Sequence, residues 1–351
     1  MPAVENTNGH DIIVIGASAG GVEALRNIAA GLPSDLKAAV FVVLHLPPGG
    51  TSVLPSILDR AGDLPAAHAV DGEAVVPGRI YVAPPDNHML LEDGTVRLAA
   101  GPRENSHRPA IDPLFRSAAS SYGPSAIGVV LSGVLDDGTA GLAAVKAAGG
   151  VTVVQNPEDA LYPGMPRSAI AYVTPEHVVP GAAIAGLLAR LVEQTPAPVP
   201  DPPLEPDAVL EESFVAVDRG ASDNPQPGVP SGFTCPECSG ALWETEEDGV
   251  VRFRCRTGHQ YSLETLLSEQ SGSIEAALWS ALRALEERGA MLRRIAQRLS
   301  QRGSPSAAFR HARNADQAVE QALLLRQALH SLHWPVEESQ PDADEAVEQV
   351  P

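Results

Sequence analysis

Residues 11–25 read DIIVIGASAGGVEAL, an apolar run that reaches a serine between glycines and continues as an amphipathic helical pattern. The same alternation recurs to about residue 194, with further apolar runs AAVFVVLHLP, SAIGVVLSGV and VTVVQ. Apolar runs joined by helical stretches are typical of strands buried on both faces. The pattern predicts an α/β fold, with a doubly wound, mostly parallel sheet covered by helices on both faces.

The chain divides into segments of different composition. We expect an α/β domain at 10–194 and an acidic, proline-rich linker at 195–230. A small cysteine-containing module at 231–262 and a helical hairpin at 263–334 follow, and the acidic tail 335–351 is expected to be disordered.

Composition excludes several classes of protein. The formal net charge of −20 disfavours binding to nucleic acid or to anionic membranes. The three cysteines all fall between positions 235 and 255, so they indicate no disulfide framework. The first ten residues lack the features of a signal peptide, and no apolar run is long enough to cross a membrane. We therefore expect a cytoplasmic protein.

Ser18 lies on a strand-to-helix turn that admits three interpretations. A dinucleotide-binding loop would need glycine at position 18, and a P-loop would need a following Lys-Ser or Lys-Thr pair, so both are disfavoured. The segment from Gly16 to Gly20 matches G-x-S-x-G, the pattern that presents a nucleophilic serine. Alone, this pentapeptide fits an ordinary glycine-rich turn equally well.

Two further strand ends carry residues that would complete a hydrolytic triad. His45 ends the second predicted strand, and Asp136 and Asp137 follow SAIGVVLSGV. The carboxyl ends of parallel strands meet at one edge of a sheet, so a serine, an imidazole and a carboxylate would gather there. Spacing alone does not decide between Asp136 and Asp137. The rival base is His88, which we expect in packing or substrate contact.

The other histidines are assigned no role. His10, His68, His107 and His177 are expected in loops, exposed to solvent.

Six ordered motifs resemble the CheB-type protein-glutamate methylesterases of bacterial chemotaxis. They are GASAGGVEAL, LHLPPG, YVAPPDNHM, SHRPAIDPLF, LSGVLDDGTAGL and NPEDALYPGMPRSAI, spread over about 11–192. The resemblance implies a serine hydrolase that removes methyl groups from glutamate γ-methyl esters of chemoreceptors, releases methanol and needs no cofactor for catalysis. Many members also deamidate receptor glutamines. Most characterised members carry an N-terminal phosphoacceptor domain, and with ten residues before the first strand we expect that control to be missing.

The resemblance also implies roles for particular residues. The nucleophile falls on Ser18, the base on His45 and the orienting acid on Asp137, because the family motif G-M-G-x-D-G ends on Asp137 and Gly138. Oxyanion and substrate contacts are expected at Ala19, Gly20, Val134, Met165 and Arg108. Three positions depart from the family pattern: Ala19 replaces a hydroxyl residue, Val134 a methionine and Leu135 a glycine. These departures leave open a second hypothesis, a binding module that keeps the fold without the activity.

The cysteine module has the spacing of a structural zinc site. Cys235 and Cys238 form C-x2-C, and Cys255 and His259 form C-x3-H sixteen residues later. Three thiolates and an imidazole complete a tetrahedral set for Zn²⁺. We expect a zinc ribbon that is independent of the α/β domain across the linker.

Two features of the C-terminal part concern partners. Arg252, Arg254 and Arg256 alternate along one predicted strand, which predicts a basic face, although the acidic chain disfavours nucleic acid as its ligand. In the first helix, leucines recur every seven residues, at Leu278, Leu285, Leu292 and Leu299. Ile295 lies in the same stripe. This stripe predicts either the core of an antiparallel hairpin or a dimer contact.

Overall fold

The computed structural model describes residues 9–46, 52–92, 94–196, 228–247 and 249–331. The chain forms two compact units, divided after Leu266. Most of the predicted linker and the whole predicted tail lie outside the described residues. Within the described ranges, no helix has both the length and the apolarity that crossing a membrane requires.

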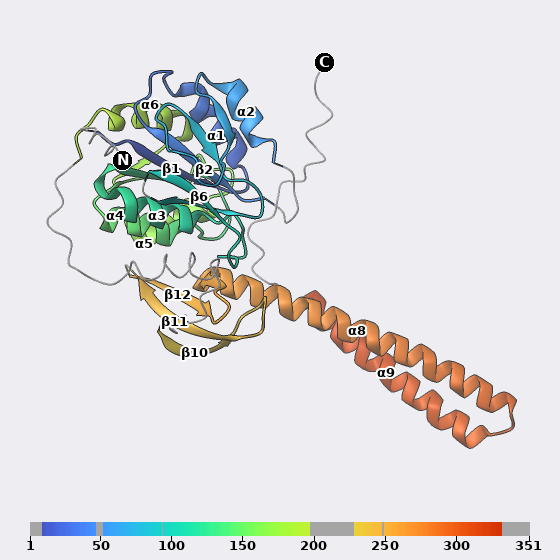
Figure 1. The fold of residues 1–351 in the computed structure, drawn as a ribbon. Coiled ribbons are helices and arrows are strands. Elements are labelled where there is room, and N and C mark those ends of the chain that lie inside the picture. Colours follow the sequence, from blue (N-terminus) through green and yellow to red (C-terminus); the bar gives the residue numbers. More distant parts are fainter. Residues whose placement is uncertain (1–8, 47–51, 93, 197–227, 248, 332–351) are drawn as a thin grey trace, which may run out of the picture. The chain divides into compact units, whose positions relative to one another are not determined.

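A seven-stranded parallel sheet forms the centre of the first unit (Figure 1). Its strand order is β3-β4-β2-β1-β7-β8-β9, and every neighbouring pair is parallel. The strands are β1 Ile12–Ala17, β2 Ala39–Leu44, β3 Ala66–His68, β4 Ile80–Val82, β7 Ala126–Val130, β8 Val151–Gln155 and β9 His177–Val179. The central strands β1, β2 and β7 are buried along their whole length, as their continuous apolar sequences predict.

Helices cover both faces of this sheet (Figure 1). One face packs against α1, α2 and α6, and the other against α3, α4 and α5. Their bounds are α1 Gly21–Gly31, α2 Leu54–Ala61, α3 Ile111–Tyr122, α4 Thr139–Ala147, α5 Gly164–Val173 and α6 Gly181–Val192, with a 3₁₀ turn at Gly123–Ser125. The predicted doubly wound α/β fold is confirmed.

The three central strands end side by side. β1 pairs with β2 on one side and with β7 on the other. The N–H of His45 donates to the carbonyl of Ala17, and the N–H of Leu131 donates to that of Gly16. The loops that carry Ser18, His45 and Asp137 therefore leave the same edge of the sheet.

A hairpin of β5 His88–Glu92 and β6 Thr95–Ala99 forms a separate two-stranded sheet. Met89, Leu91 and Val96 from this hairpin join the same apolar cluster as α3.

The cysteine module is a four-stranded antiparallel sheet in the order β10-β11-β12-β13. Its strands are β10 Val229–Thr234, β11 Ala241–Glu247, β12 Val250–Cys255 and β13 Gln260–Ser262. The sheet belongs to the same compact unit as the α/β domain, and β13 is hydrogen-bonded to the segment around Glu104. The expectation of a ribbon independent of the α/β domain is therefore wrong.

The predicted basic face of the ribbon is also wrong. Arg252 and Arg254 are buried, and only Arg256 is exposed. Arg252 points into the α/β domain, where it pairs with Glu104 and Asp112.

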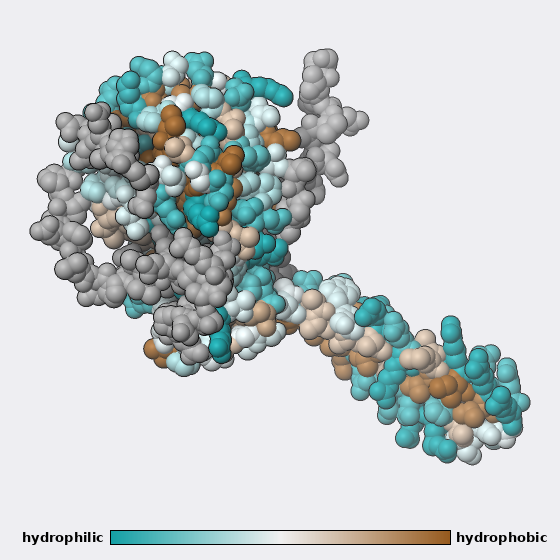
Figure 2. All heavy atoms as spheres, viewed as in Figure 1, coloured by the Kyte–Doolittle hydropathy of each residue, from teal (hydrophilic) through white to brown (hydrophobic). Residues whose placement is uncertain are grey.

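The second unit consists of the remainder of α8 Leu263–Gln301 and of α9 Pro305–Ser331. The two helices are joined by a turn at Gly303 and form a hairpin. Arg326 of α9 pairs with Glu286 of α8 across it. Four alanines of α9 are buried: Ala308, Ala315, Ala318 and Ala322. Figure 2 shows apolar side chains along the hairpin surface. Ile295, which belongs to the predicted leucine stripe of α8, is exposed.

Candidate active site

Ser18 follows β1 on the turn that leads into α1. Its N–H donates to the carbonyl of Ser132 and its carbonyl accepts from the N–H of Gly21, so both backbone groups are fixed. Gly20 has a left-handed backbone with φ of 73°, a conformation that costs little only for glycine. A Cβ on Gly16 would lie 2.3 Å from Ile111 Cγ2. Both glycines of G-x-S-x-G are therefore required by the structure: Gly16 by the close approach of Ile111, and Gly20 by its left-handed backbone.

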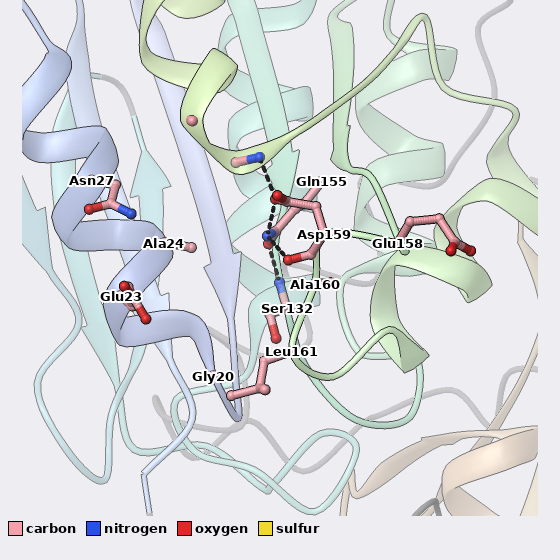
Figure 3. A pocket seen from close by; sticks show the side chains of 12 residues that line it. Gly20, Glu23, Ala24, Asn27, Ser132, Gln155, Glu158, Asp159, Ala160 and Leu161 are labelled. Atoms are coloured by element: carbon pink, nitrogen blue, oxygen red, sulfur yellow. Dashed lines mark hydrogen bonds between the residues drawn. The ribbon is translucent and has the colours of Figure 1, made fainter. Parts of the chain in front are cut away.

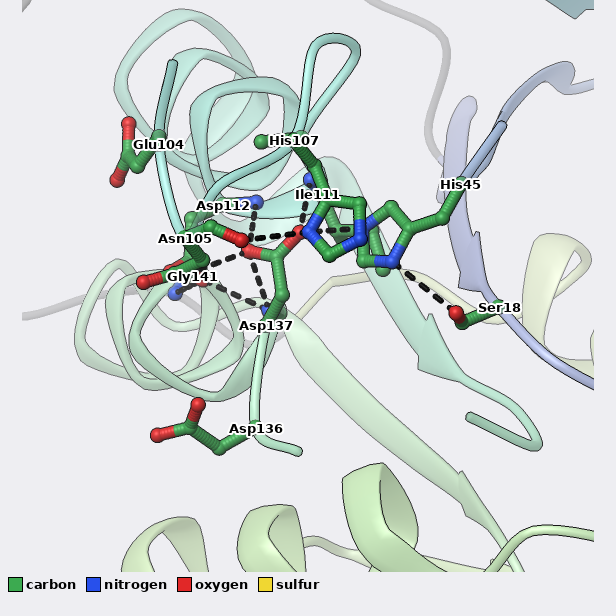
Figure 4. A network of polar contacts seen from close by, with 12 residues as sticks. Ser18, His45, Glu104, Asn105, His107, Ile111, Asp112, Asp136, Asp137 and Gly141 are labelled. Atoms are coloured by element: carbon green, nitrogen blue, oxygen red, sulfur yellow. Dashed lines mark hydrogen bonds and ion pairs between the residues drawn. The ribbon is translucent and has the colours of Figure 1, made fainter. Parts of the chain in front are cut away.

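Ser18, His45 and Asp137 form a continuous hydrogen-bonded chain (Figure 4). His45 Nδ1 lies 3.1 Å from Ser18 Oγ, and His45 Nε2 lies 2.7 Å from Asp137 Oδ2. Since an ionised carboxylate only accepts, the proton of a neutral His45 resides on Nε2. The Nδ1 lone pair therefore faces the serine hydroxyl, as a general base requires.

Asp137 is buried and surrounded by hydrogen-bond donors. Besides His45, the N–H of Ile111 donates to Oδ2 at 2.7 Å, and Asn105 Nδ2 and the N–H of Gly138 donate to Oδ1 at 3.0 Å each. Burial alone would raise the pKa of Asp137, but the hydrogen bond from His45 and its electrostatic attraction hold this pKa well below its usual range. The carboxylate stays ionised and fixed beside the imidazole.

The structure separates the two neighbouring aspartates. Asp136 points away from His45, and its Oδ1 accepts from Ser262 Oγ at 2.7 Å and from Thr265 Oγ1 at 3.0 Å (Figure 4). Burial raises the pKa of Asp136 to about 6, although the two hydroxyls oppose this. Sequence spacing did not decide between Asp136 and Asp137. These contacts favour Asp137 as the orienting acid.

His88 lies outside this chain of contacts. Its Nε2 lies 3.0 Å from the carbonyl of Pro102, and its Nδ1 accepts from the N–H of Ala110. Burial lowers the pKa of His88, so the imidazole is neutral. Both ring nitrogens are used within the fold, in agreement with a packing role.

The expectation of solvent-exposed loop histidines is wrong. His10 is buried, and His68 and His177 lie in strands β3 and β9. His107 stacks on His45, with ring centroids 3.6 Å apart and an interplanar angle of 10°. Burial lowers the pKa of His107 to about 4, and the neighbouring His45 adds to this shift. A neutral imidazole thus covers one face of the base.

Asn105 and Asp112 are site residues that the sequence did not reveal. Asn105 Nδ2 donates to Asp137 Oδ1 and, at 3.1 Å, to Asp112 Oδ2. Asp112 Oδ1 accepts from the N–H groups of Gly138 and Gly141, at 3.0 and 2.7 Å, which holds the start of α4. Both residues lie in or beside the SHRPAIDPLF motif, which gave the only signal.

The backbone around Ser18 offers donors for a developing oxyanion. No hydrogen bond of the described residues uses the N–H groups of Ala19, Gly20 or Val134, whereas the N–H of Gly133 donates to the carbonyl of Tyr162. Met165 is fully buried beside this turn, and its N–H donates to the carbonyl of Gly133 at 2.9 Å. Ala19, Gly20, Val134 and Met165 thus lie beside the nucleophile, and their roles stay predictions.

Leu135 has a φ of 59°, in the left-handed region. The family pattern has glycine at this position, and glycine adopts a left-handed backbone without strain. Leucine in the same conformation is strained. The Arg108 guanidinium donates to the carbonyls of Ala100 and Gly101, so its contacts lie within the fold. A substrate contact at Arg108 also stays a prediction.

A cavity of about 540 Å³ opens beside the serine loop (Figure 3). Gly20 lies on its wall, together with Leu161 and the start of α6. The exposed carboxylates of Glu23 and Glu158 also line it. None of the triad residues Ser18, His45 and Asp137 lines this cavity, and its acidic wall disfavours anionic ligands.

Three cysteines and a histidine of the ribbon form a compact cluster. The Sγ atoms of Cys235, Cys238 and Cys255 and a ring nitrogen of His259 all lie within 4.8 Å of one another. Cys238 Sγ lies 3.6 Å from Cys255 Sγ, and His259 Nδ1 lies 3.6 Å from Cys235 Sγ and 3.5 Å from Cys255 Sγ. Zn–S bonds of about 2.3 Å place tetrahedral sulfur ligands about 3.8 Å apart, so the spacing fits this geometry. His259 Nε2 lies 3.2 Å from a Glu237 carboxylate, a typical second partner of a metal-bound imidazole.

Comparison with known proteins identifies the α/β domain. The family model of CheB methylesterase matches residues 13–188. The chain belongs to the CheB methylesterase family. The crystal structure of the Thermotoga maritima CheB methylesterase catalytic domain aligns with a TM-score of 0.50 and 37% identity, over 52% of this chain and 100% of that one.

Curated CheB-family relatives carry the name protein-glutamate methylesterase/protein-glutamine glutaminase. The relative from Chromohalobacter salexigens is 44% identical over 177 residues, which are 49% of this chain and 48% of the relative. The relative from Anaeromyxobacter dehalogenans whose name carries the number 5 is 41% identical over 184 residues, 51% of each chain. The chain thus spans about half the length of the curated relatives it matches, and the match falls on the CheB methylesterase domain.

Proposed function

We propose that the chain is a serine esterase that hydrolyses glutamate γ-methyl esters of methyl-accepting chemotaxis receptors in the cytoplasm. The observation that carries the proposal is the chain of contacts from Ser18 through His45 to the buried Asp137. The names of the curated relatives support the choice of substrate.

The contacts suit two successive acyl transfers. His45 Nδ1 takes the proton of Ser18 Oγ as the oxygen attacks the ester carbonyl, while Asp137 stabilises the charged imidazole. The N–H groups of Ala19, Gly20 and Val134 would hold the oxyanion. The protonated imidazole then gives its proton to the departing methoxide, and methanol leaves. A water molecule attacks the acyl-serine in the same way and releases the glutamate.

Receptor glutamines are a second proposed substrate. The same steps on a glutamine side chain release ammonia instead of methanol, and the names of the relatives include glutaminase. The amide is neutral like the methyl ester and smaller by one methyl group, so no change of site is needed.

Methanol release from a methylated cytoplasmic receptor fragment tests the function. We expect turnover by the full chain and a loss of about 10⁴-fold or more in Ser18→Ala. The exposed loop residue Ser34 supplies the matched control Ser34→Ala, which should keep wild-type turnover. Absence of turnover in the folded wild type, or a Ser18→Ala variant within tenfold of it, would refute the proposal in favour of a non-catalytic binding module.

We also propose that the ribbon cluster binds one structural Zn²⁺. All four positions of a tetrahedral site would be taken by protein, so the metal would have no position open for substrate. Gently purified full chain should contain one zinc per molecule by elemental analysis. Cys238→Ser is the sharpest variant, because Cys238 is exposed whereas the other two cysteines are buried in the ribbon core. Metal-free wild type, or full zinc content in Cys238→Ser, would contradict the site.

The helical hairpin is proposed to self-associate with a second copy. The alanines of α9 face α8, whereas Phe309, Leu323 and Leu324 are 53–69% exposed. At 100° per residue these three side chains share the side of α9 opposite the alanines. A paired copy would bury them. Light scattering should find a dimer that Phe309→Glu with Leu324→Glu converts to a monomer, and a monomeric wild type would exclude this contact.

A further inference from the structure

Residues 103–105 of the methylesterase domain run beside β13, the edge strand of the ribbon, and pair with it through a single bridge. The N–H of Asn105 donates to the carbonyl of Gln260 at 2.8 Å, and the N–H of Gln260 donates to that of Arg103 at 3.3 Å. Glu104 and Gln260 form a parallel bridge. The segment that carries Asn105 and His107 toward the triad is therefore held from behind by β13.

The side chain of Asn105 connects the ribbon to Asp137. Its Oδ1 accepts from the N–H of Ser262 at 2.9 Å, while its Nδ2 donates to Asp137 and Asp112. An N–H on one side and two carboxylates on the other allow only one orientation of the amide. The ribbon backbone thus fixes the donor that contacts Asp137.

Arg252 adds a buried charge from the ribbon. Its guanidinium pairs with Glu104 and, at 3.2 Å, with Asp112 Oδ2. Glu104 is also paired with Arg116, at 2.8 and 2.9 Å. Burial opposes ionisation of Glu104, yet the two guanidiniums lower its pKa to about 2. For Asp112, burial raises the pKa to about 7 and Arg252 opposes the rise.

Three buried carboxylates, those of Glu104, Asp112 and Asp137, lie in one network with two arginines. Arg116 comes from the methylesterase domain, and Arg252 comes from the ribbon. Arg252 is the cation paired with Asp112, which in turn shares the Asn105 amide with Asp137. Without Arg252, the Asp112 carboxylate would have only neutral hydrogen-bond donors and would lie close to the carboxylate of Asp137. Burying two negative charges in this way costs folding free energy.

We propose that the ribbon forms part of the catalytic site: Arg252 and the β13 backbone are positioning groups that hold Asp137 against His45 through Asn105 and Asp112. This inference rests on the proposed esterase function. Neither Arg252 nor β13 contacts the Ser18 hydroxyl, so their loss should lower the rate of the chemical step and leave substrate binding nearly unchanged. A shift of about 1 Å in a catalytic group costs up to about 100-fold in rate.

The first test compares three variants of the full chain. Arg252→Met keeps the apolar stem and removes the charge, and we expect kcat to fall about 10- to 100-fold while KM stays within about threefold. Arg252→Lys restores one ion pair but cannot span two carboxylates, so kcat should recover to within about tenfold of wild type. Arg256→Met makes the same change at an exposed ribbon position and should match wild type.

A second readout does not depend on activity. The proton between His45 Nε2 and Asp137 should give a downfield NMR resonance, and Arg252→Met should shift or broaden it at unchanged zinc content. This signal distinguishes the two proposals, since an inactive wild type with a resonance sensitive to Arg252 would refute only the esterase function. An unchanged kcat and resonance in folded Arg252→Met would overturn the positioning role, even if the melting temperature fell.

A double-mutant cycle identifies the route. Asn105 has a φ of 49°, so Asn105→Gly removes the side chain without backbone strain. If Arg252 acts through Asn105, the double variant should lose little more kcat than Asn105→Gly alone, whereas multiplied losses would exclude this route. If Arg252→Met does not fold, Arg252→Lys carries the test: a kcat severalfold below wild type supports the proposal, and wild-type kcat overturns it.

Discussion

Asp137→Asn should lower turnover strongly by changing the tautomer of His45. The side chain now accepts at both oxygens, from His45 and the N–H of Ile111 at Oδ2 and from Asn105 and backbone N–H groups at Oδ1. An asparagine must direct its NH₂ toward one of these sets. The smaller mismatch lies at Oδ2, where His45 can adapt by carrying its proton on Nδ1. That proton then faces Ser18 Oγ, and the base is lost.

The magnitudes follow from this geometry. A wrong tautomer costs about 10⁴-fold in kcat, or about 5.5 kcal/mol of transition-state stabilisation. The N–H of Ile111 loses its acceptor in a buried site, which costs about 1–3 kcal/mol of folding stability. In a domain of this size, that lowers the melting temperature by roughly 2–12 °C.

Methanol release and calorimetry measure the two effects on the same sample. Asp136→Asn is the matched control, because both hydroxyls that contact Asp136 donate to one oxygen, Oδ1, which asparagine retains. It should keep turnover within about twofold. An Asp137→Asn variant with turnover within tenfold of wild type, or with an unchanged melting temperature, would refute the tautomer argument.

Three smaller predictions concern neighbouring residues. His107→Ala removes the ring stacked on His45 and should lower kcat about tenfold, with His107→Phe restoring most of it, and equal kcat in all three would exclude a role for stacking. Gly133→Ala would place a Cβ 2.0 Å from Met165 Sδ and 2.8 Å from the serine Cβ, so kcat should fall about 100-fold and recover in part with Met165→Ala; an undiminished kcat would contradict the close packing. The pKa of Asp136 is about 6 in the folded protein and 3.8 in the unfolded chain. Its contribution to folding stability is therefore present below pH 3.8 and lost as pH rises through 6. Asp136→Asn should therefore match wild type in urea unfolding at pH 4 and exceed it by up to about 3 kcal/mol at pH 7.5, and parallel stability curves would contradict this linkage.

The sheet could be predicted because its strands are continuous apolar runs, and the positions of Ser18 and His45 follow from where those runs end. The positions of Asn105 and His107 could not be predicted. The backbone is left-handed at two consecutive residues, Asn105 and Ser106, and this turn directs the side chains of Asn105 and His107 toward the triad. No periodic pattern signals such a turn. The alternation of Arg252 and Arg254 correctly indicated that they share a face. Alternation does not tell which face another part of the chain will cover.

Glu104 and Arg252 are 148 residues apart in the chain. During synthesis the strands and helices of the methylesterase domain emerge first, and its last helix, α6, ends at Val192. At about 5–20 residues per second, β13 leaves the ribosome roughly 4–14 s later. Each newly made molecule therefore passes through an interval in which its nucleophile and base have been synthesised but the strand behind Asn105 has not. The order of translation makes completion of the site a late event in the life of every copy.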